Sequence, residues 1–214
     1  MDVLGGLESG DKYRLTVPGL GYDIEIPYVV LPSGDRSIRI ASFNLVGQTR
    51  LNRDLGRLLA ARIRDVFEDL KGLVFLTAVE KALMLVQSIA QELEVEAVAV
   101  AYNRVKPHME ADRRPLIQVG SSSVTSGSKF MALYERDIHL IARAPRGIVV
   151  VDDVVSTGGT LLALEDLLEE VAAHCGHPLP SIQGVFCVAQ EGELQTLPAY
   201  PVHALTRLPH PEFV

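Results

Sequence analysis

Apolar residues recur along this chain with two different spacings, which predict helices and strands in turn. Between residues 54 and 69, and again between 83 and 93, they recur every three or four positions, the spacing of a helix with one buried face. A third helix is predicted for residues 161–175, with a glycine directly after it. Short and nearly continuous apolar runs, typical of buried parallel strands, lie at 73–76, 95–102, 147–155 and 182–189.

The alternation of these strands with helices predicts an α/β fold, a doubly wound parallel sheet covered by helices on both faces. The first 50 residues and the last 20 lack this rhythm and alternate in short pieces instead, such as 22–30 and 37–43. We assign them to a small antiparallel cap, which includes residues 202–209. The expected organisation is a single domain with a core at about 51–194 and a cap, or hood, formed by 1–50 and about 195–214.

The charge and the cysteine content restrict the classes of function. The net charge of −7 has the wrong sign for a surface that must attract a phosphate backbone, so we expect no nucleic-acid partner. Residues 1–12 contain no basic segment followed by an apolar run, and Glu80 and Lys81 interrupt the most apolar region, so we expect no membrane segment. Cys175 and Cys187, the two cysteines, suit a reducing compartment, and we expect a cytoplasmic protein.

The strongest candidate site follows the third predicted strand, because open α/β sheets bind ligands beyond the carboxyl ends of their strands. Asp152 and Asp153 lie at the tip of that strand. The turn that opens the next helix consists of Ser156, Thr157, Gly158, Gly159 and Thr160. A glycine-rich turn at a helix N-terminus directs backbone N–H groups and the positive end of the helix dipole at one point, which favours a phosphate.

Two adjacent carboxylates beside a phosphate site would repel that ligand, unless they bind its hydroxyl groups or act through a divalent cation. Ribose hydroxyls together with magnesium meet both conditions. The alternative is a capped helix after a strand with no ligand at all. Other phosphate motifs do not occur, since no Gly-Lys-Ser or Gly-Lys-Thr follows a strand, and Gly19 with Gly21 lacks the third glycine of a dinucleotide-binding turn.

The apolar strand, the acidic pair and the Thr-Gly-Gly-Thr turn together resemble the phosphoribosyl pyrophosphate (PRPP) motif of type I phosphoribosyltransferases. The resemblance extends over about residues 55–189 and is closest to the adenine-type and xanthine-type purine enzymes. It implies transfer of the 5-phosphoribosyl group from PRPP to a purine base, with an adenine-type substrate favoured, in purine salvage. It also implies Mg²⁺ as cofactor, carried by PRPP and held with the help of Asp152 and Asp153, and a homodimer.

The resemblance further implies a role for each part of the motif. The turn from Ser156 to Thr160 would hold the 5′-phosphate, and Asp152 and Asp153 would hold the ribose hydroxyls, with Asp153 also stabilising the developing cation. The loop after the first strand would hold the pyrophosphate with backbone amides, and its residues here are Ala78, Val79, Glu80 and Lys81. Glu80 and Lys81 can alternatively be an exposed charge pair that begins a helix.

After the second strand the family carries a basic pair, where this chain has Tyr102 and Asn103, and then a Lys-Pro-Tyr-Met-like stretch. Lys106 matches that stretch and, with Arg104, would supply positive charge to the pyrophosphate during catalysis. Further candidates in or beside the following loop are Arg113, Arg114 and Lys129. These cations can instead belong to a solvated loop. Asn103 in place of a lysine supports the alternative function, a catalytically weak or inactive regulatory protein that binds PRPP.

Two further segments have less specific sequences. The serine-rich segment 121–128 fits a lid over the substrate or an exposed hairpin connection. In the cap, Phe43 is the candidate for stacking on the base. His174, Cys175 and His177 lie close together at a helix end without a second ligand pair, and we expect no metal site there.

Overall fold

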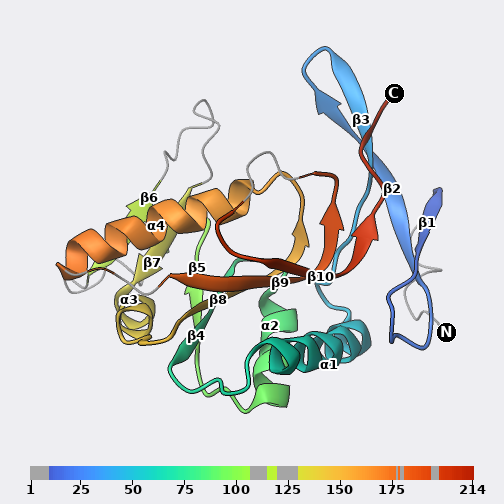
Figure 1. Ribbon diagram of the computed structural model, residues 1–214. Coiled ribbons are helices and arrows are strands. Elements are labelled where there is room, and N and C mark those ends of the chain that lie inside the picture. The colour runs from blue at the N-terminus through green and yellow to red at the C-terminus, as the bar shows by residue number, and fades with distance from the viewer. Residues whose placement is uncertain (1–9, 107–114, 120–129, 177, 179–180, 194–197) are drawn as a thin grey trace.

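The centre of the fold is a five-stranded sheet in which every strand is parallel to its neighbours, in the order β10-β9-β8-β4-β5 (Figure 1). The computed structural model describes residues 10–106, 115–119, 130–176, 178, 181–193 and 198–214. The strands are β4 (Leu73–Ala78), β5 (Val98–Ala101), β8 (Gly147–Val155), β9 (Ile182–Glu191) and β10 (Val202–Leu208). The four apolar runs in the sequence therefore correspond to β4, β5, β8 and β9, as predicted.

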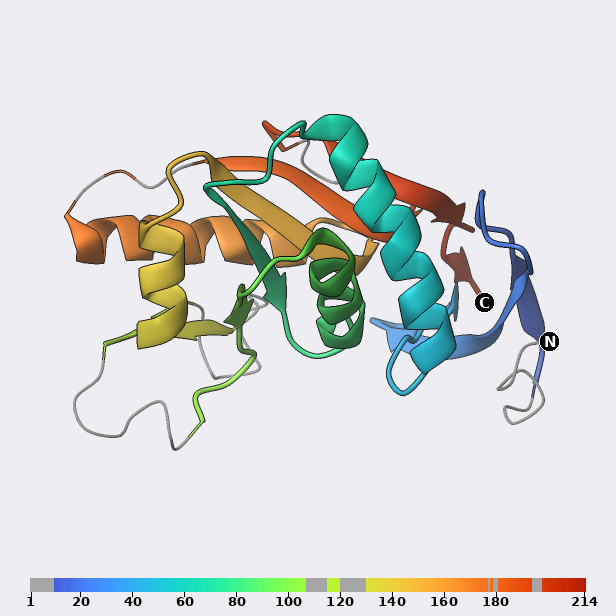
Figure 2. The same ribbon diagram turned by 90° about the horizontal axis from the view of Figure 1, so that it is seen from below.

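Helices cover both faces of this sheet, which confirms the doubly wound α/β fold. Helices α1 (Thr49–Val66) and α2 (Leu83–Leu93) pack on one face, and α3 (Glu135–Ala142) and α4 (Gly159–Cys175) on the other (Figures 1 and 2). Successive strand residues point to opposite faces, so Phe75 and Val149 join the cluster with α1 and α2. Their chain neighbours Leu76 and Val150 join the cluster with α3 and α4.

Helix α1 begins five residues earlier than predicted, at Thr49 rather than residue 54, and ends at Val66 because Phe67 adopts an extended backbone. A short antiparallel pair that the apolar pattern did not predict, β6 (Leu116–Val119) and β7 (Met131–Tyr134), precedes α3. Each of its strands has only four residues, too few for a clear period. None of the helices within the described ranges has the length and apolar character needed to cross a membrane.

The cap is a four-stranded antiparallel sheet in the order β1-β2-β3-β11. Its strands are β1 (Lys12–Leu15), β2 (Ile24–Ser33), β3 (Arg36–Ala41) and β11 (Glu212–Phe213), so both chain ends contribute to it, as predicted. The assignment of residues 202–209 to the cap is wrong, because 202–208 form β10 beside β9. As an edge strand β10 is only half-buried along most of its length, so its apolar content resembles that of the cap strands rather than the inner strands.

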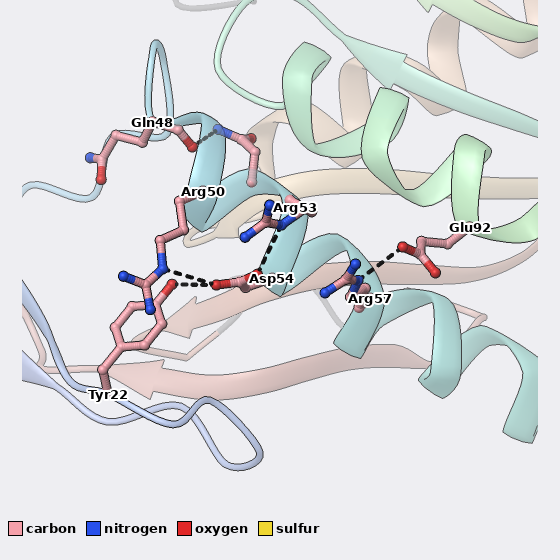
Figure 3. A network of polar contacts seen from close by, with 8 residues as sticks. Tyr22, Gln48, Arg50, Arg53, Asp54, Arg57 and Glu92 are labelled. Carbon is pink, nitrogen blue, oxygen red and sulfur yellow. Dashed lines mark hydrogen bonds and ion pairs between the residues drawn. The ribbon is translucent and has the colours of Figure 1, made fainter. Parts of the chain in front are cut away.

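Polar contacts join the cap to helix α1 and to β10. The Tyr22 hydroxyl donates to Oδ2 of Asp54 at 3.0 Å, and the guanidinium of Arg50 lies 4.6 Å from the centre of the Tyr22 ring (Figure 3). Nε of Arg50 is also 3.5 Å from Asp54 Oδ2. On the other side, the Thr206 hydroxyl donates to the carbonyl of Thr16 at 2.9 Å. These contacts hold the cap beside the carboxyl ends of the parallel strands.

Candidate active site

A cavity of about 600 Å³ lies at the carboxyl ends of β4, β8 and β9, where the end of β3 meets the sheet. Seven separate parts of the chain line it: residues 40–43 at the end of β3, the loop after β4, Asn103, residues 130–131, the end of β8 with the turn that follows, Glu191 at the end of β9 and Leu208 at the end of β10. Most of the residues singled out in the sequence therefore meet in one place. Among them are Phe43, Ala78, Val79, Glu80, Lys81, Asp152, Asp153, Ser156, Gly158, Gly159 and Thr160.

The acidic pair lies within β8, just past the last residue that pairs with β4, where β8 still pairs with β9. Just before it, the buried Thr77 hydroxyl donates to the carbonyl of Val151 at 2.8 Å and ties β4 to β8. The backbone N–H of Asp153 donates to Oδ1 of Asp152 at 2.9 Å, so Asp152 helps to fix the backbone of its neighbour. Asp153 is only 7% exposed, and its Oδ2 has no hydrogen-bond partner among the described atoms. Buried polar atoms normally have such partners, so Asp153 Oδ2 is an acceptor available to a ligand.

The turn after β8 has the geometry of a phosphate site. Gly158 precedes α4 and has φ +87°, a left-handed conformation that glycine adopts without the steric cost paid by other residues. The first turn of α4 contains no acidic residue that would neutralise the positive end of the helix dipole. Ser156, Gly158, Gly159 and Thr160 line the cavity. Thr157 is exposed and, among the described residues of the turn, is the one outside the lining.

The loop after β4 follows the strand that pairs with β8, and all four of its predicted residues line the cavity. The Val79 N–H donates to the carbonyl of Ala101 on β5 at 2.9 Å, and the peptide bond between Val79 and Glu80 is cis. Lys81 turns toward the cap, where its Nζ donates to the carbonyl of Phe43 at 3.5 Å. The loop therefore contacts both the parallel sheet and the segment that follows β3.

The predicted cations after β5 are not brought into this cavity. Asn103 lines it, whereas Arg104 and Lys106 lie outside its lining in the described part of the chain. Lys81 is the only lysine or arginine among the lining residues that the structure describes. Residues 107–114 and 120–129, which include Arg113, Arg114, Lys129 and the serine-rich segment 121–128, lie outside the described residues.

Sequence reasoning missed the residues that close the cavity on the side of β9 and β10. Glu191 ends β9 and Leu208 ends β10, the two are paired across the strands, and both line the cavity. Burial raises the pKa of the Glu191 carboxyl, and the positive charge of Lys81 opposes that shift. The strand-end rule that identified Asp152 and Asp153 would also have identified Glu191, if it had been applied to the fourth apolar run.

Comparisons with known proteins agree on this fold. The sequence profile of the family described as "Phosphoribosyl transferase domain" matches residues 47–178. Adenine phosphoribosyltransferase from Thermoanaerobacter pseudethanolicus is 16% identical with a TM-score of 0.54, covering 85% of this chain and 95% of its own. The enzyme of the same name from Rhodothermus marinus is 17% identical with a TM-score of 0.54, covering 92% and 94%. That from Saccharomyces cerevisiae, solved with an imino-altritol bisphosphate and adenine, is 14% identical with a TM-score of 0.51, covering 91% and 93%.

At these identities the structural likeness concerns the fold. Among curated proteins, none matches the sequence significantly. The profile match covers more than half of the chain and includes the loop after β4, the acidic pair and the glycine turn.

Proposed function

Because this chain belongs to the phosphoribosyltransferase domain family, we propose that it transfers the 5-phosphoribosyl group of PRPP to a purine base. The products are a nucleoside monophosphate and pyrophosphate. The observation that carries the proposal is the single cavity of about 600 Å³ that the acidic pair, the glycine turn and the loop after β4 line together. A cavity of this size suits one nucleotide-sized ligand.

Each part of the site suits one part of PRPP. The backbone N–H groups at the start of α4, between Ser156 and Thr160, bind the 5′-phosphate, helped by the helix dipole. The carboxylates of Asp152 and Asp153 accept hydrogen bonds from the ribose hydroxyls, for which the unpartnered Oδ2 of Asp153 is available. The loop from Ala78 to Lys81 faces the pyrophosphate. Arg104 and Lys106 remain candidates for pyrophosphate binding that require movement toward the cavity.

In the reaction a ring nitrogen of the base bonds to the anomeric carbon as the bond from that carbon to the pyrophosphate oxygen breaks. The proton on the attacking nitrogen passes to water, and the electron pair of the broken bond departs with pyrophosphate. Positive charge develops on the ribose ring, and the Asp153 carboxylate, held rigidly at the end of β8, stabilises it. The chain thus contributes mainly by positioning the two reactants and by fixed charge.

Mg²⁺ fits this site. The ion typically binds one or two carboxylates together with substrate phosphates and water, and Asp152 and Asp153 offer two carboxylates at the cavity. When bound, Mg²⁺ neutralises negative charge on the pyrophosphate leaving group.

The base lies on the cap side in this proposal. Phe43 lines the cavity there, although it is only 3% exposed and packs mainly in the core, so it contacts the base with part of its ring. The structures with the same fold that are named adenine phosphoribosyltransferases support a purine, with adenine favoured. Family membership also underlies the proposals of a homodimer and of a role in cytoplasmic purine salvage.

A second candidate is a regulatory protein that binds PRPP without catalysis. It is favoured by Asn103, an uncharged residue in the cavity wall, and by the position of Arg104 and Lys106 outside the described lining. Such a protein would keep the phosphate and ribose contacts but lack the positive charge that the leaving group requires.

The experiment that tests both candidates is release of pyrophosphate from PRPP with Mg²⁺, using adenine, guanine, hypoxanthine, xanthine and orotate in parallel. Turnover with a purine supports the transferase. Silence with all five bases, alongside tight PRPP binding in calorimetry, supports the regulator. Absence of PRPP binding rejects both.

A further inference from the structure

A second cavity, of about 580 Å³, lies between helix α3 and the beginning of β4. It is separate from the candidate active site, because β4 begins at the second cavity with Leu73 and Val74 and reaches the first cavity with Ala78 at its other end. Both views place α3 on the side of the molecule away from the cap (Figures 1 and 2). The proposed phosphoribosyl transfer uses none of the residues that line this second cavity.

One wall of the second cavity carries a row of nitrogen donors. Arg136, His139 and Arg143 line it, and their spacing of three and then four residues places them on one face of α3 and its end. From the first to the last this row extends about 10 Å along the helix. Glu135 is the one acid among the lining residues that the structure describes. The row therefore offers several N–H groups side by side.

A buried acid holds the first of these side chains in place. Nη2 of Arg136 donates to Oδ1 of Asp137 at 2.7 Å, and the same oxygen accepts the backbone N–H of Val100 on β5 at 3.1 Å. Asp137 is fully buried, whereas 55% of the Arg136 side chain is exposed, so the other N–H groups of its guanidinium are accessible to a ligand. Arg143 is exposed and forms no ion pair with any acid that the structure describes.

The rest of the lining is mainly apolar. Leu73 and Val74 of β4 and Leu140 of α3 are partly buried there, together with the ring of Tyr134 at the end of β7. The guanidinium of Arg136 lies 5.8 Å from the centre of that ring, so the apolar part and the row of donors adjoin. A ligand that fits both parts has an anionic chain at one end and a flat, weakly polar ring at the other. A cavity of this volume suits a small molecule.

We propose that the second cavity binds a nucleotide, with its phosphates along Arg136, His139 and Arg143 and its base against Leu73 and Val74. Guanidinium groups suit phosphates, because their N–H groups form paired, charge-assisted hydrogen bonds with phosphate oxygens. A row of donors about 10 Å long matches a chain of phosphates better than a single one, which favours a nucleoside triphosphate. This proposal is independent of the transferase function.

The test is calorimetric binding of ATP to the full chain in buffer without Mg²⁺, comparing the wild type with Arg143→Glu. Arg143 is chosen because replacing Arg136 would leave the buried Asp137 without its ion pair and destabilise the fold. The matched control is Arg62→Glu, the same change at an exposed arginine of α1, which packs on the other face of the sheet. Asp153→Asn reports any ATP that binds in the active site instead.

Two further probes separate the parts of the ligand. Tripolyphosphate carries the anionic chain without a base, and adenosine carries the base without phosphates. If the phosphates lie along α3, Arg143→Glu weakens the binding of tripolyphosphate as it weakens that of ATP, and it leaves the binding of adenosine unchanged. His139→Gln, a smaller change on the same helix face, gives a second variant if Arg143→Glu lowers the thermal stability.

The expected result is that Arg143→Glu weakens ATP binding about tenfold or more, because it removes a charge-assisted hydrogen bond and adds a repelling charge. Arg62→Glu and Asp153→Asn should keep the wild-type affinity within about twofold. Three outcomes overturn the proposal. The first is a wild type that does not bind ATP. The second is an equal loss in Arg62→Glu, which assigns the effect to net charge. The third is a loss in Asp153→Asn with Arg143→Glu unchanged, which places ATP in the active site.

Discussion

Replacing Asp153 by asparagine should weaken PRPP binding and strongly reduce turnover while leaving the fold intact. Asparagine has nearly the same shape, and the backbone N–H of residue 153 keeps its 2.9 Å hydrogen bond to Asp152. The change removes the negative charge and converts one acceptor of a side chain that is 7% exposed into a donor.

The magnitude follows from the hydrogen bonds that the carboxylate offers. A hydrogen bond to a charged group contributes about 1.5–3 kcal/mol, and Oδ2 of Asp153 has no partner among the residues that the structure describes. One lost bond to a ribose hydroxyl therefore weakens PRPP binding about 10-fold to 100-fold. Turnover should fall further, because the same charge stabilises the developing cation only in the transition state.

Calorimetry with PRPP and Mg²⁺ measures the first effect, and pyrophosphate release measures the second. Asp166→Asn is the matched control, since Asp166 is an exposed acid on α4 outside the cavity lining and its replacement makes the same change in net charge. Thermal unfolding of both variants should stay close to that of the wild type.

Two outcomes would refute this reasoning. PRPP affinity and turnover unchanged in Asp153→Asn would mean that the buried carboxylate does not face the substrate. Equal losses in Asp153→Asn and Asp166→Asn would mean that net charge, rather than a contact in the cavity, determines binding.

Two further predictions concern stability and pH. Gly56→Ala should lower the free energy of unfolding in urea by about 1–3 kcal/mol, because its new Cβ would lie 2.6 Å from Cβ of Ser88, which outweighs the gain of about 1 kcal/mol in helix propensity; a more stable variant contradicts this. Burial acts to raise the pKa of the Asp54 carboxyl, but hydrogen bonds from Tyr22 and Arg53 outweigh it and lower that pKa. The stability that the ionised Asp54 carboxylate contributes is therefore fully present above the pKa that it has in the unfolded chain. That stability is lost as the pH falls through the lower pKa of the folded protein. Tyr22→Phe should lower the free energy of unfolding by about 0.5–1.5 kcal/mol at neutral pH, and this difference from wild type should shrink in acid. Denaturation measured across pH tests this, and a difference that stays constant contradicts it.

The hydrophobic pattern by itself predicted the inner strands and the main helices, and the residues that follow the third strand indicated the acidic pair and glycine turn as the candidate site. These features are local: a buried parallel strand must be apolar on both faces, a helix on a sheet must repeat every three or four residues, and a tight turn before α4 needs Gly158. Each of these features depends only on residues that are close together in the sequence. The roles given to the site residues stay predictions, which the substitution at Asp153 tests.

Only the tertiary structure decided which segments meet. Residues 202–208 look like cap strands because an edge strand is half exposed, and their parallel pairing with β9 depends on contacts distant in sequence. The same pairing brings Glu191 into the cavity wall, and the packing of the cap turns Lys81 toward Phe43. These arrangements depend on which surfaces remain exposed after the core has formed, so a local sequence pattern does not predict them.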